Sequence, residues 1–399
     1  MSVTDHTTAP ITIEAIKASV DSIGDVLQAA SADAEALGRL SADAAEALRS
    51  TELFKCWWPA ELGGPNATVR DGIEIIEAVA AVDTSAAWNL AVCTLGSGLA
   101  GAYLEQDAVE AIFAEDLPLI AGQTAPVGRA VPVEGGVEVS GQWSFGSGIH
   151  LASWVKAGVL IERADGAPEP AIVVVPAERV TIDEESWNVA GLAGSGSYNY
   201  SMDGVHVPDG YWYSFPVADP KRGGATYRLP IPGQLVILHA GFALGVAQRC
   251  LDEITGMATA KIRQFDDASI GTRGTFQFAL AENHAAVSAA RLHTYDVADR
   301  MVEAADTPEA PTLMREMRAA ARYANDVALE IATWAFRQGG GAALRLDHPL
   351  QRLLRDMFAA TQHIYVDDRA YTDHGMSLIG LRPPARSAPA PQSPTGATR

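Results

Sequence analysis

The chain has 399 residues, of which 48% are hydrophobic and 20% charged, and its formal net charge is −20 at pH 7. This length provides one large domain or two to three smaller ones with ample core, while the strong negative charge argues against nucleic acid or anionic lipid as a partner. We expect neither a membrane span nor a secretory signal, because no run of about 18 apolar residues and no basic segment followed by an apolar block is visible.

The first part of the chain, residues 1–116, is predicted to be helical. It is rich in alanine and has apolar residues at helical spacing on one face: Ile13, Ile16, Val20, Ile23 and Val26. Residues 69–83 repeat the pattern, and Asp83 is a candidate N-cap for the helix that follows it. Breaks are expected at Pro59 and at Gly63 and Gly64.

Residues 117–215 are predicted to form a β domain. The segment 131–143 reads as two strands around a Glu134-Gly135-Gly136 turn, which is a hairpin pattern. Further strands are expected at 154–162, 170–176 and 197–208, where apolar residues alternate or form a short buried run.

Residues 216–382 return to helical spacing. Long helices are expected over 235–258, 275–304, 312–338 and 349–368, and their short connections indicate an antiparallel four-helix bundle. The tail 383–399 is rich in Pro, Ala and Ser and is predicted to be disordered.

Metal and disulfide chemistry is not expected. The three cysteines, Cys56, Cys93 and Cys250, and the nine scattered histidines lack metal-ligand spacing, and three cysteines cannot make a disulfide framework. These features favour a reducing, cytoplasmic location. A GxGxxG fingerprint is absent, which argues against a separate dinucleotide domain.

Several motifs resemble the acyl-CoA dehydrogenase family over residues 12–382. They are Gly339-Gly340-Gly341, Pro349 and the pair Arg355-Asp356, but the position of the family's catalytic Glu holds Ile364, preceded by His363. Segments 81–92, 141–154 and 187–200 are most similar to the reduced-flavin monooxygenase branch, such as the oxygenase components of 4-hydroxyphenylacetate hydroxylase and dibenzothiophene monooxygenases. The resemblance implies an α+β fold with an N-terminal helical domain, a middle β-barrel or sandwich and a C-terminal four-helix bundle.

The resemblance also implies an activity. Isoleucine cannot take a proton, so ordinary dehydrogenation would lose its base. The chain is expected to be the oxygenase component of a two-component monooxygenase, in which a separate reductase supplies reduced FMN or FAD. Reaction with O2 would give a C4a-hydroperoxyflavin that oxygenates a small hydrophobic substrate, with an aromatic one favoured. Relatives of this fold form homotetramers, which is the assembly expected here.

Cofactor-binding residues are also implied by the resemblance. Phe145, Gly146 and Ser147 would lie along the flavin, with Ser147 near N5, and Trp187 would border the ring. Viewed without the family, Ser147 is more often an incidental turn residue and Trp187 is as often core as contact. Gln123 and Thr124 would add polar contacts.

For the flavin phosphate the candidate cation is Arg263, acting across a subunit boundary. It lies two residues before Phe265, where relatives have three, and Lys261 competes with it. FMN and FAD therefore remain equally open.

His363 is the candidate acid/base group, beside the lost Glu position and at the end of the last predicted helix. A histidine on an apolar helix is more often a packed side chain. Asn89 and His374 are candidate substrate contacts.

Two alternatives remain. One is an acyl-CoA dehydrogenase with a relocated base, although the corresponding place near Gln234 and Leu235 has no carboxylate. The other is a flavin-free homologue that serves as a binding protein.

Overall fold

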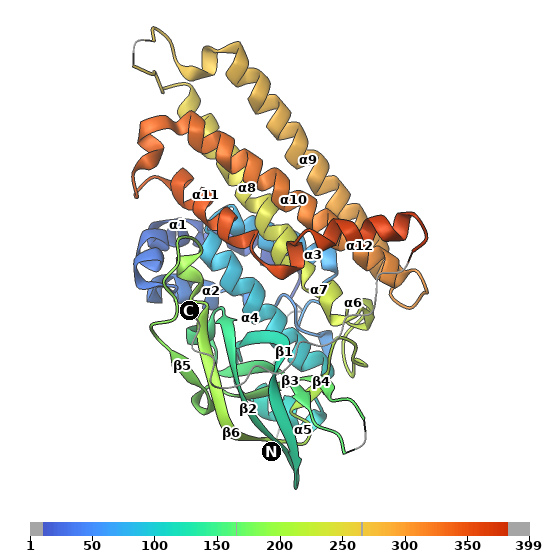
Figure 1. The fold of residues 1–399 in the computed structure, drawn as a ribbon. Helices are drawn as coiled ribbons and strands as arrows, with labels where there is room; N and C mark the ends of the chain where they lie inside the picture. Colours follow the sequence, from blue (N-terminus) through green and yellow to red (C-terminus); the bar gives the residue numbers. More distant parts are fainter. Residues whose placement is uncertain (1–10, 165, 265, 382–399) are drawn as a thin grey trace, which may run out of the picture.

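The computed structural model describes residues 11–164, 166–264 and 266–381. The predicted disorder of 383–399 and the position of Phe265 lie outside these residues. Two helical regions and one sheet form the molecule: the N-terminal helices lie between the sheet and the C-terminal bundle (Figure 1). The expected α+β fold is confirmed.

The N-terminal helices are α1 (Ile13–Leu37), α2 (Ala42–Arg49), α3 (Val69–Ala80), α4 (Thr84–Tyr103) and α5 (Gln106–Ile112), with short 3-10 turns at Leu53–Lys55 and Ala60–Leu62. Helices α1, α2, α3 and α5 bury one face each, whereas α4 is buried on nearly every side. Asp83 caps α4 by accepting the Ala86 N–H at 2.7 Å, so the predicted N-cap is confirmed. In α1, Leu27 completes the buried face in place of Val26, which was expected there but is 44% exposed. The reason is that a residue four positions after Ile23 lies on the same face of the helix as Ile23.

The β region is one mixed sheet of seven strands in the order β5-β6-β2-β1-β3-β4-β7. The strands are β1 (Ile120–Val133), β2 (Gly136–Gly146), β3 (Trp154–Ile161), β4 (Glu169–Pro176), β5 (Thr181–Asp183), β6 (Tyr198–Pro208) and β7 (Trp212–Ser214). The predicted hairpin is confirmed, since Val133 pairs with Gly136 in an antiparallel register. In contrast, β1 and β3 are parallel.

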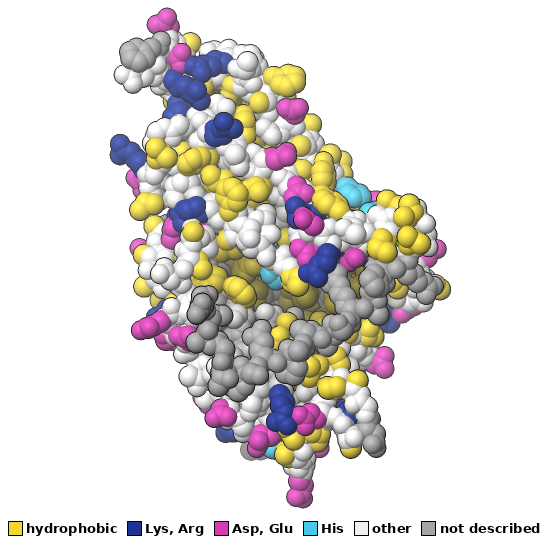
Figure 2. Space-filling model, in the orientation of Figure 1, with side chains coloured by type: hydrophobic (Ala, Val, Ile, Leu, Met, Phe, Trp, Pro, Cys, Tyr) yellow, Lys and Arg dark blue, Asp and Glu magenta, His cyan; other side chains and the backbone are white. Residues whose placement is uncertain are grey.

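In the described part of the C-terminal region, residues 216–264 and 266–381, there are two short helices and five longer ones. They are α6 (Ala225–Arg228), α7 (Ile231–Gln234), α8 (Val236–Ala258), α9 (Gly274–Glu303), α10 (Ala310–Gly339), α11 (Pro349–Ala360) and α12 (Arg369–Leu378). Hydrophobic side chains gather on part of the outer face of this bundle (Figure 2).

Helix α8 packs closely against both α3 of the N-terminal region and α10 of the bundle. A Cβ at Gly241 would lie 2.7 Å from the Ile73 carbonyl oxygen, and one at Gly245 would lie 2.4 Å from that of Glu77, so these glycines permit close packing against α3. By length and composition the segment Ile231–Ala258 would pass for a membrane span, but 83% of its apolar window is buried inside the protein. Its apolar surface is therefore explained by its neighbours in the core.

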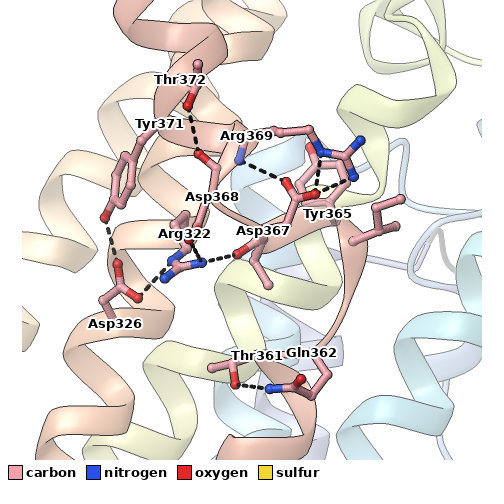
Figure 3. A network of polar contacts seen from close by, with 12 residues as sticks. Arg322, Asp326, Thr361, Gln362, Tyr365, Asp367, Asp368, Arg369, Tyr371 and Thr372 are labelled. Carbon is pink, nitrogen blue, oxygen red and sulfur yellow. Dashed lines mark hydrogen bonds and ion pairs between the residues drawn. The ribbon is translucent and has the colours of Figure 1, made fainter. Parts of the chain in front are cut away.

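The last predicted helix, 349–368, is wrong as one continuous helix. Helix α11 ends at Ala360, a 3-10 turn η8 (Ile364–Val366) follows, and α12 begins at Arg369. Two arginines of α10 hold this turn by its carbonyls: Arg318 donates to those of Ile364 and Tyr365 at 2.7 and 2.6 Å, and Arg322 donates to that of Val366 at 2.7 Å. Figure 3 shows Arg322 between Asp326 and the turn. Such contacts replace the bonds that a continuing helix would make.

Candidate active site

Ser147 lies at the end of β2, where it joins a buried chain of hydroxyls. The indole N–H of Trp88, from α4, donates to Ser147 Oγ at 3.1 Å, and Ser197 Oγ lies 2.6 Å from the same atom. Ser195 Oγ lies 2.7 Å from Ser197 Oγ. When Ser195 donates to Ser197 and Ser197 to Ser147, the Ser147 hydroxyl accepts two hydrogen bonds and keeps its own proton for a further acceptor.

Phe145 is held in an unusual conformation next to this chain. Its φ is 64°, a region that costs a bulky residue roughly 1–2 kcal/mol, and its side chain is 63% exposed. Its ring meets Trp187 edge to face at 6.3 Å, and the Trp187 indole N–H donates to the Ala193 carbonyl at 2.9 Å. The structure thus brings the predicted pair Phe145 and Trp187 together as an aromatic surface that a planar ligand could cover.

Gln123 and Thr124 lie on β1, beside the end of β2. The Gln123 side chain donates to the Ser144 carbonyl at 3.3 Å and accepts the Thr124 N–H at 3.1 Å. The amide of Gln123 therefore bridges the two strands, and its second N–H remains as a donor for a cofactor.

His363 lies in the non-helical link between α11 and α12. Its Nδ1 accepts the Tyr365 backbone N–H at 3.1 Å, so in the neutral ring the proton is on Nε2. Desolvation, followed by the nearby charge of Arg318, lowers the pKa of His363 to about 4. As a residue His363 is nevertheless exposed to solvent. This geometry favours a hydrogen-bond donor over a base.

A second histidine, His239 of α8, lies beside His363. The ring centroids of the two, the histidine pair, are 4.2 Å apart, and Trp88 meets them edge-on at 5.9 and 6.5 Å. Only 2% of His239 is exposed, and burial, with a smaller effect of His363, holds its pKa well below the usual 6.5. Because Trp88 also bonds Ser147, the aromatic cluster links the two predicted catalytic residues.

His239 was not among the residues predicted from the sequence. It lies in the apolar run 235–258, where a histidine resembles an ordinary core residue. The only signal was an imidazole in a run of apolar side chains, which gives no indication of the partner that it meets across the fold.

Arg263 does not join this cluster within one chain. Helix α8 has 23 residues and is about 34 Å long. His239 lies near its first residue, and Arg263 follows its last residue. There its guanidinium donates to Gln338 at 3.1 Å. Arg263 and the histidine pair thus lie near opposite ends of α8 within one chain, and the predicted subunit-boundary role stays a prediction.

The two predicted substrate contacts are less direct. Asn89 is 1% exposed, and its side-chain N–H group donates to the carbonyls of Ser85 and Gly194 at 2.8 and 3.2 Å. It therefore connects α4 to the loop 191–197, called the serine loop because it carries Ser195 and Ser197. It also borders a cavity of about 360 Å³ lined by residues that include Gly148 and Ser195. His374 is on α12, and within residues 11–381 as described it has no ring contact with the cluster.

The predicted Arg-Asp pair holds the site together. Asp356 is 2% exposed; its two oxygens accept the Leu192 N–H and the Thr84 hydroxyl, both at 2.6 Å. Arg355 donates to the Ala190 carbonyl at 2.8 Å and pairs with Glu35. One carboxylate thus fixes the start of α4, which carries Trp88, and the loop that carries the serines.

These residues suit a flavin ring: an exposed aromatic surface, a hydroxyl donor and a neutral imidazole donor meet in one place. Ile364, at the family's Glu position, is 61% exposed and offers no proton acceptor.

Comparisons with known proteins show which families and folds the chain is similar to. A family model described as "Acyl-CoA dehydrogenase, C-terminal domain" matches residues 237–368. The chain is 28% identical over 384 residues to the FADH(2)-dependent resorcinol hydroxylase, oxygenase component, of Rhizobium sp. (strain MTP-10005), covering 91% of this chain and 94% of the relative. It is 27% identical over 348 residues to an indole-3-acetate monooxygenase of Pseudomonas putida, covering 86% and 88%. XiaF from Streptomyces sp., solved with FADH2 and glycerol, has a TM-score of 0.85 at 21% identity and covers 94% and 97% of the two chains.

Proposed function

The chain is a relative of the acyl-CoA dehydrogenase-fold, flavin-dependent monooxygenases, and from that premise we propose that it is the oxygenase component of a two-component system. It would use reduced flavin and O2 to place one oxygen atom on a small hydrophobic, aromatic substrate. The observation that supports this most is the cluster of Ser147, Trp88 and His363, which offers hydrogen-bond donors and no carboxylate base.

Each residue has a role in this proposal. The flavin, when bound in its reduced form, supplies the electrons that activate O2. Phe145 and Trp187 cover the ring, Ser147 and His363 donate hydrogen bonds, and the surrounding apolar side chains exclude water. Arg263 of a neighbouring subunit binds the phosphate. Reduced FAD is the first cofactor to test because the resorcinol hydroxylase is FADH(2)-dependent and XiaF was solved with FADH2; FMN is the alternative.

The dehydrogenase alternative also lacks a catalytic base at the other position considered, near Gln234 and Leu235. Gln234 is buried and its side-chain N–H group donates to the Tyr103 hydroxyl at 2.8 Å and to the Leu229 carbonyl at 3.1 Å. A neutral amide engaged in this way cannot remove a proton. The relatives, too, are named as monooxygenases and hydroxylases.

The proposed function is tested by supplying reduced flavin and O2 with a panel of small aromatic compounds. We expect at least one compound to gain one oxygen atom, detected by mass spectrometry. Loss of colour of bound oxidised FAD on adding an acyl-CoA would instead support the dehydrogenase. Failure to bind any flavin would support the binding-protein alternative.

Reduced flavin is expected to bind more tightly than oxidised flavin, because the oxygenase must take it from a reductase and release the oxidised form. Anaerobic titration of the purified protein with FAD and FMN in both redox states measures this. We expect at least a tenfold lower Kd for the reduced form, about 1.4 kcal/mol. Tighter binding of oxidised than of reduced flavin would contradict a two-component system, whether or not the protein is cytoplasmic.

A homotetramer is the expected assembly. Exposed apolar side chains occur along the bundle, among them Phe278, Leu292 and Phe358, at 71%, 70% and 50% exposure. Phe358 and Trp334 also line a hollow of about 440 Å³ on α10 and α11. Light scattering should give four times the chain mass of 42.0 kDa. A stable monomer at micromolar concentration would contradict the prediction, and Phe358→Asp should weaken the assembly.

A further inference from the structure

Three serine hydroxyls form a buried chain that leads from the end of β2 into the serine loop. Ser147 Oγ lies 2.6 Å from Ser197 Oγ, and Ser197 Oγ lies 2.7 Å from Ser195 Oγ. The three residues are 6%, 4% and 1% exposed, in that order. A hydroxyl both donates and accepts hydrogen bonds, and its proton rotates about the Cβ–Oγ bond. Each contact of this hydroxyl chain can therefore pass a proton in either direction.

The Ser195 end of the hydroxyl chain borders the cavity of about 360 Å³. The walls of the cavity include Gly148 and Leu151, and its rim includes Leu37 and Arg39, which are exposed at the end of α1 and just after it. A water molecule takes about 30 Å³ in the liquid, so the cavity has room for on the order of ten of them. Ser195 is therefore the place where the hydroxyl chain meets solvent.

Backbone and indole hydrogen bonds hold the two ends of the hydroxyl chain in place. The Gly148 N–H donates to the Ser195 carbonyl at 3.0 Å, which fixes the serine loop against the end of β2. At the other end the Trp88 indole N–H donates to Ser147 Oγ at 3.1 Å. An indole N–H can only donate, so Trp88 always fills one acceptor site of Ser147 and directs the Ser147 proton to the remaining contacts.

The proposed function needs a proton as well as the exclusion of water. FADH⁻, O2, substrate and one H⁺ give FAD, the oxygenated product and H2O; in the absence of substrate, FADH⁻, O2 and one H⁺ give FAD and hydrogen peroxide. Water beside the flavin promotes side reactions. His363 has no surplus proton to give, because burial lowers its pKa to about 4. A chain of hydroxyls meets both needs, since it passes protons but no water molecules.

We propose that Ser195, Ser197 and Ser147 form a proton relay that carries one proton per turnover from the cavity to the flavin. The inference rests on the proposed function, in which Ser147 faces the flavin. Ser147 Oγ gives its proton to an acceptor on the flavin side and takes that of Ser197, Ser197 takes that of Ser195, and Ser195 takes one from water. One O–H bond breaks and one forms at each oxygen, and the hydroxyls then rotate back to their starting order. Ser195 and Ser197 act through Ser147 and are positioning residues.

Cysteine substitution tests the cavity route without turnover. The protein is saturated with reduced FAD under anaerobic conditions and treated with iodoacetamide, and the alkylated positions are found by mass spectrometry. We expect Ser195→Cys to react about tenfold or more faster than Ser197→Cys, because position 195 borders the cavity. The wild type gives the background from the buried Cys56, Cys93 and Cys250. Reaction of Ser195→Cys at this background rate would overturn the inference.

Breaking the hydroxyl chain tests proton transfer. The complex with reduced FAD is mixed with O2, without substrate, in H2O, D2O and their mixtures, and the flavin absorbance gives the rate of oxidation. The wild-type rate should fall along a curve as the D2O fraction rises, because several hydroxyl protons move together. Ser197→Ala should slow oxidation by roughly 10² and lose the curvature, and Ser197→Thr, which keeps a hydroxyl, should restore both.

Ser97→Ala is the matched control. Ser97 is a buried serine of α4 whose hydroxyl donates to the Cys93 and Pro118 carbonyls at 3.0 and 2.7 Å, outside the hydroxyl chain. Its loss should lower the melting temperature as Ser197→Ala does, but leave the oxidation rate and its dependence on D2O unchanged. Ser195→Ala interrupts the hydroxyl chain nearer the cavity and covers the case in which Ser197→Ala does not fold.

The outcomes separate the relay from the proposed function. A Ser197→Ala protein that binds reduced FAD and is oxidised at the wild-type rate, with the wild-type dependence on D2O, would overturn the relay and leave the proposed function standing. A wild-type protein that binds no reduced flavin would instead overturn the proposed function itself.

Discussion

Replacing His363 with alanine is expected to lower the yield of oxygenated product by roughly 10² or more, the range found when a group that assists proton or charge transfer is removed. Reduced flavin should still react with O2, so hydrogen peroxide should appear in place of product. The reason is that the variant lacks the Nε2–H donor while Ser147 and the aromatic surface remain. The measurement is the ratio of product to peroxide with a substrate identified in the screen.

His363→Asn separates this role from a structural one. The Nδ1 atom of His363 caps the turn by accepting the Tyr365 N–H, and an asparagine oxygen at the same place can accept it as well. His363→Ala should therefore reduce the free energy of unfolding by about 1 kcal/mol and lower the melting temperature, whereas His363→Asn should change neither. Both should lose product. A fully coupled His363→Asn enzyme would show that the residue only caps the turn. Ser147→Ala, which keeps His363, should also raise peroxide release.

The second large effect is expected at Asp356. Asp356→Ala leaves the Leu192 N–H and the Thr84 hydroxyl without their partner, at about 1–3 kcal/mol each, and should lower the melting temperature by several degrees. Activity should fall as well, because Asp356 fixes the start of α4 and the serine loop. The matched control is Asp252→Asn, at an exposed carboxylate on α8, which should leave both unchanged. An unchanged melting temperature of Asp356→Ala would contradict the stabilising role of the bonds from Asp356 to Leu192 and Thr84.

Asp356→Asn should show a dependence on pH. Burial raises the pKa of Asp356 from 3.8 to about 6, so the folded protein binds this proton more tightly than the unfolded chain. The resulting stability is fully present below pH 3.8 and is lost as the pH rises through 6; it amounts to roughly 3 kcal/mol. Asn does not titrate, so the variant should gain stability relative to the wild type between pH 4 and 7.5. A constant difference in melting temperature over this range would refute the assignment.

Periodicity and short-range signals predicted much of the architecture. Asp83 before an apolar helical run is a local cap, and Gly135 with Gly136 between two alternating segments is a local turn; both are decided by neighbours in the chain. The apolar character of 235–258 likewise predicted a helix buried among others. Such features depend on the residues themselves, so they can be read without the fold.

The resemblance to a known family supplied the candidate residues, and the structure arranged only some of them together. Phe145, Ser147, Trp187 and His363 lie around one place, whereas Arg263 lies at the other end of α8. Whether Arg263 contacts the flavin of a neighbouring subunit depends on the predicted assembly, which no local pattern encodes.

Only the tertiary structure decided the chemistry at the centre of the site. The break after Ala360 exists because Arg318 and Arg322, more than forty residues earlier, bind the carbonyls of the turn. The same break places His363 against His239, about 120 residues away in the chain, and fixes the ring nitrogen that His363 can use. By itself the sequence determined which helices and strands form, because these follow from spacing and caps. It could not determine the tautomer, the partner or the charge of a buried imidazole, because these depend on atoms that only folding brings within a few ångströms.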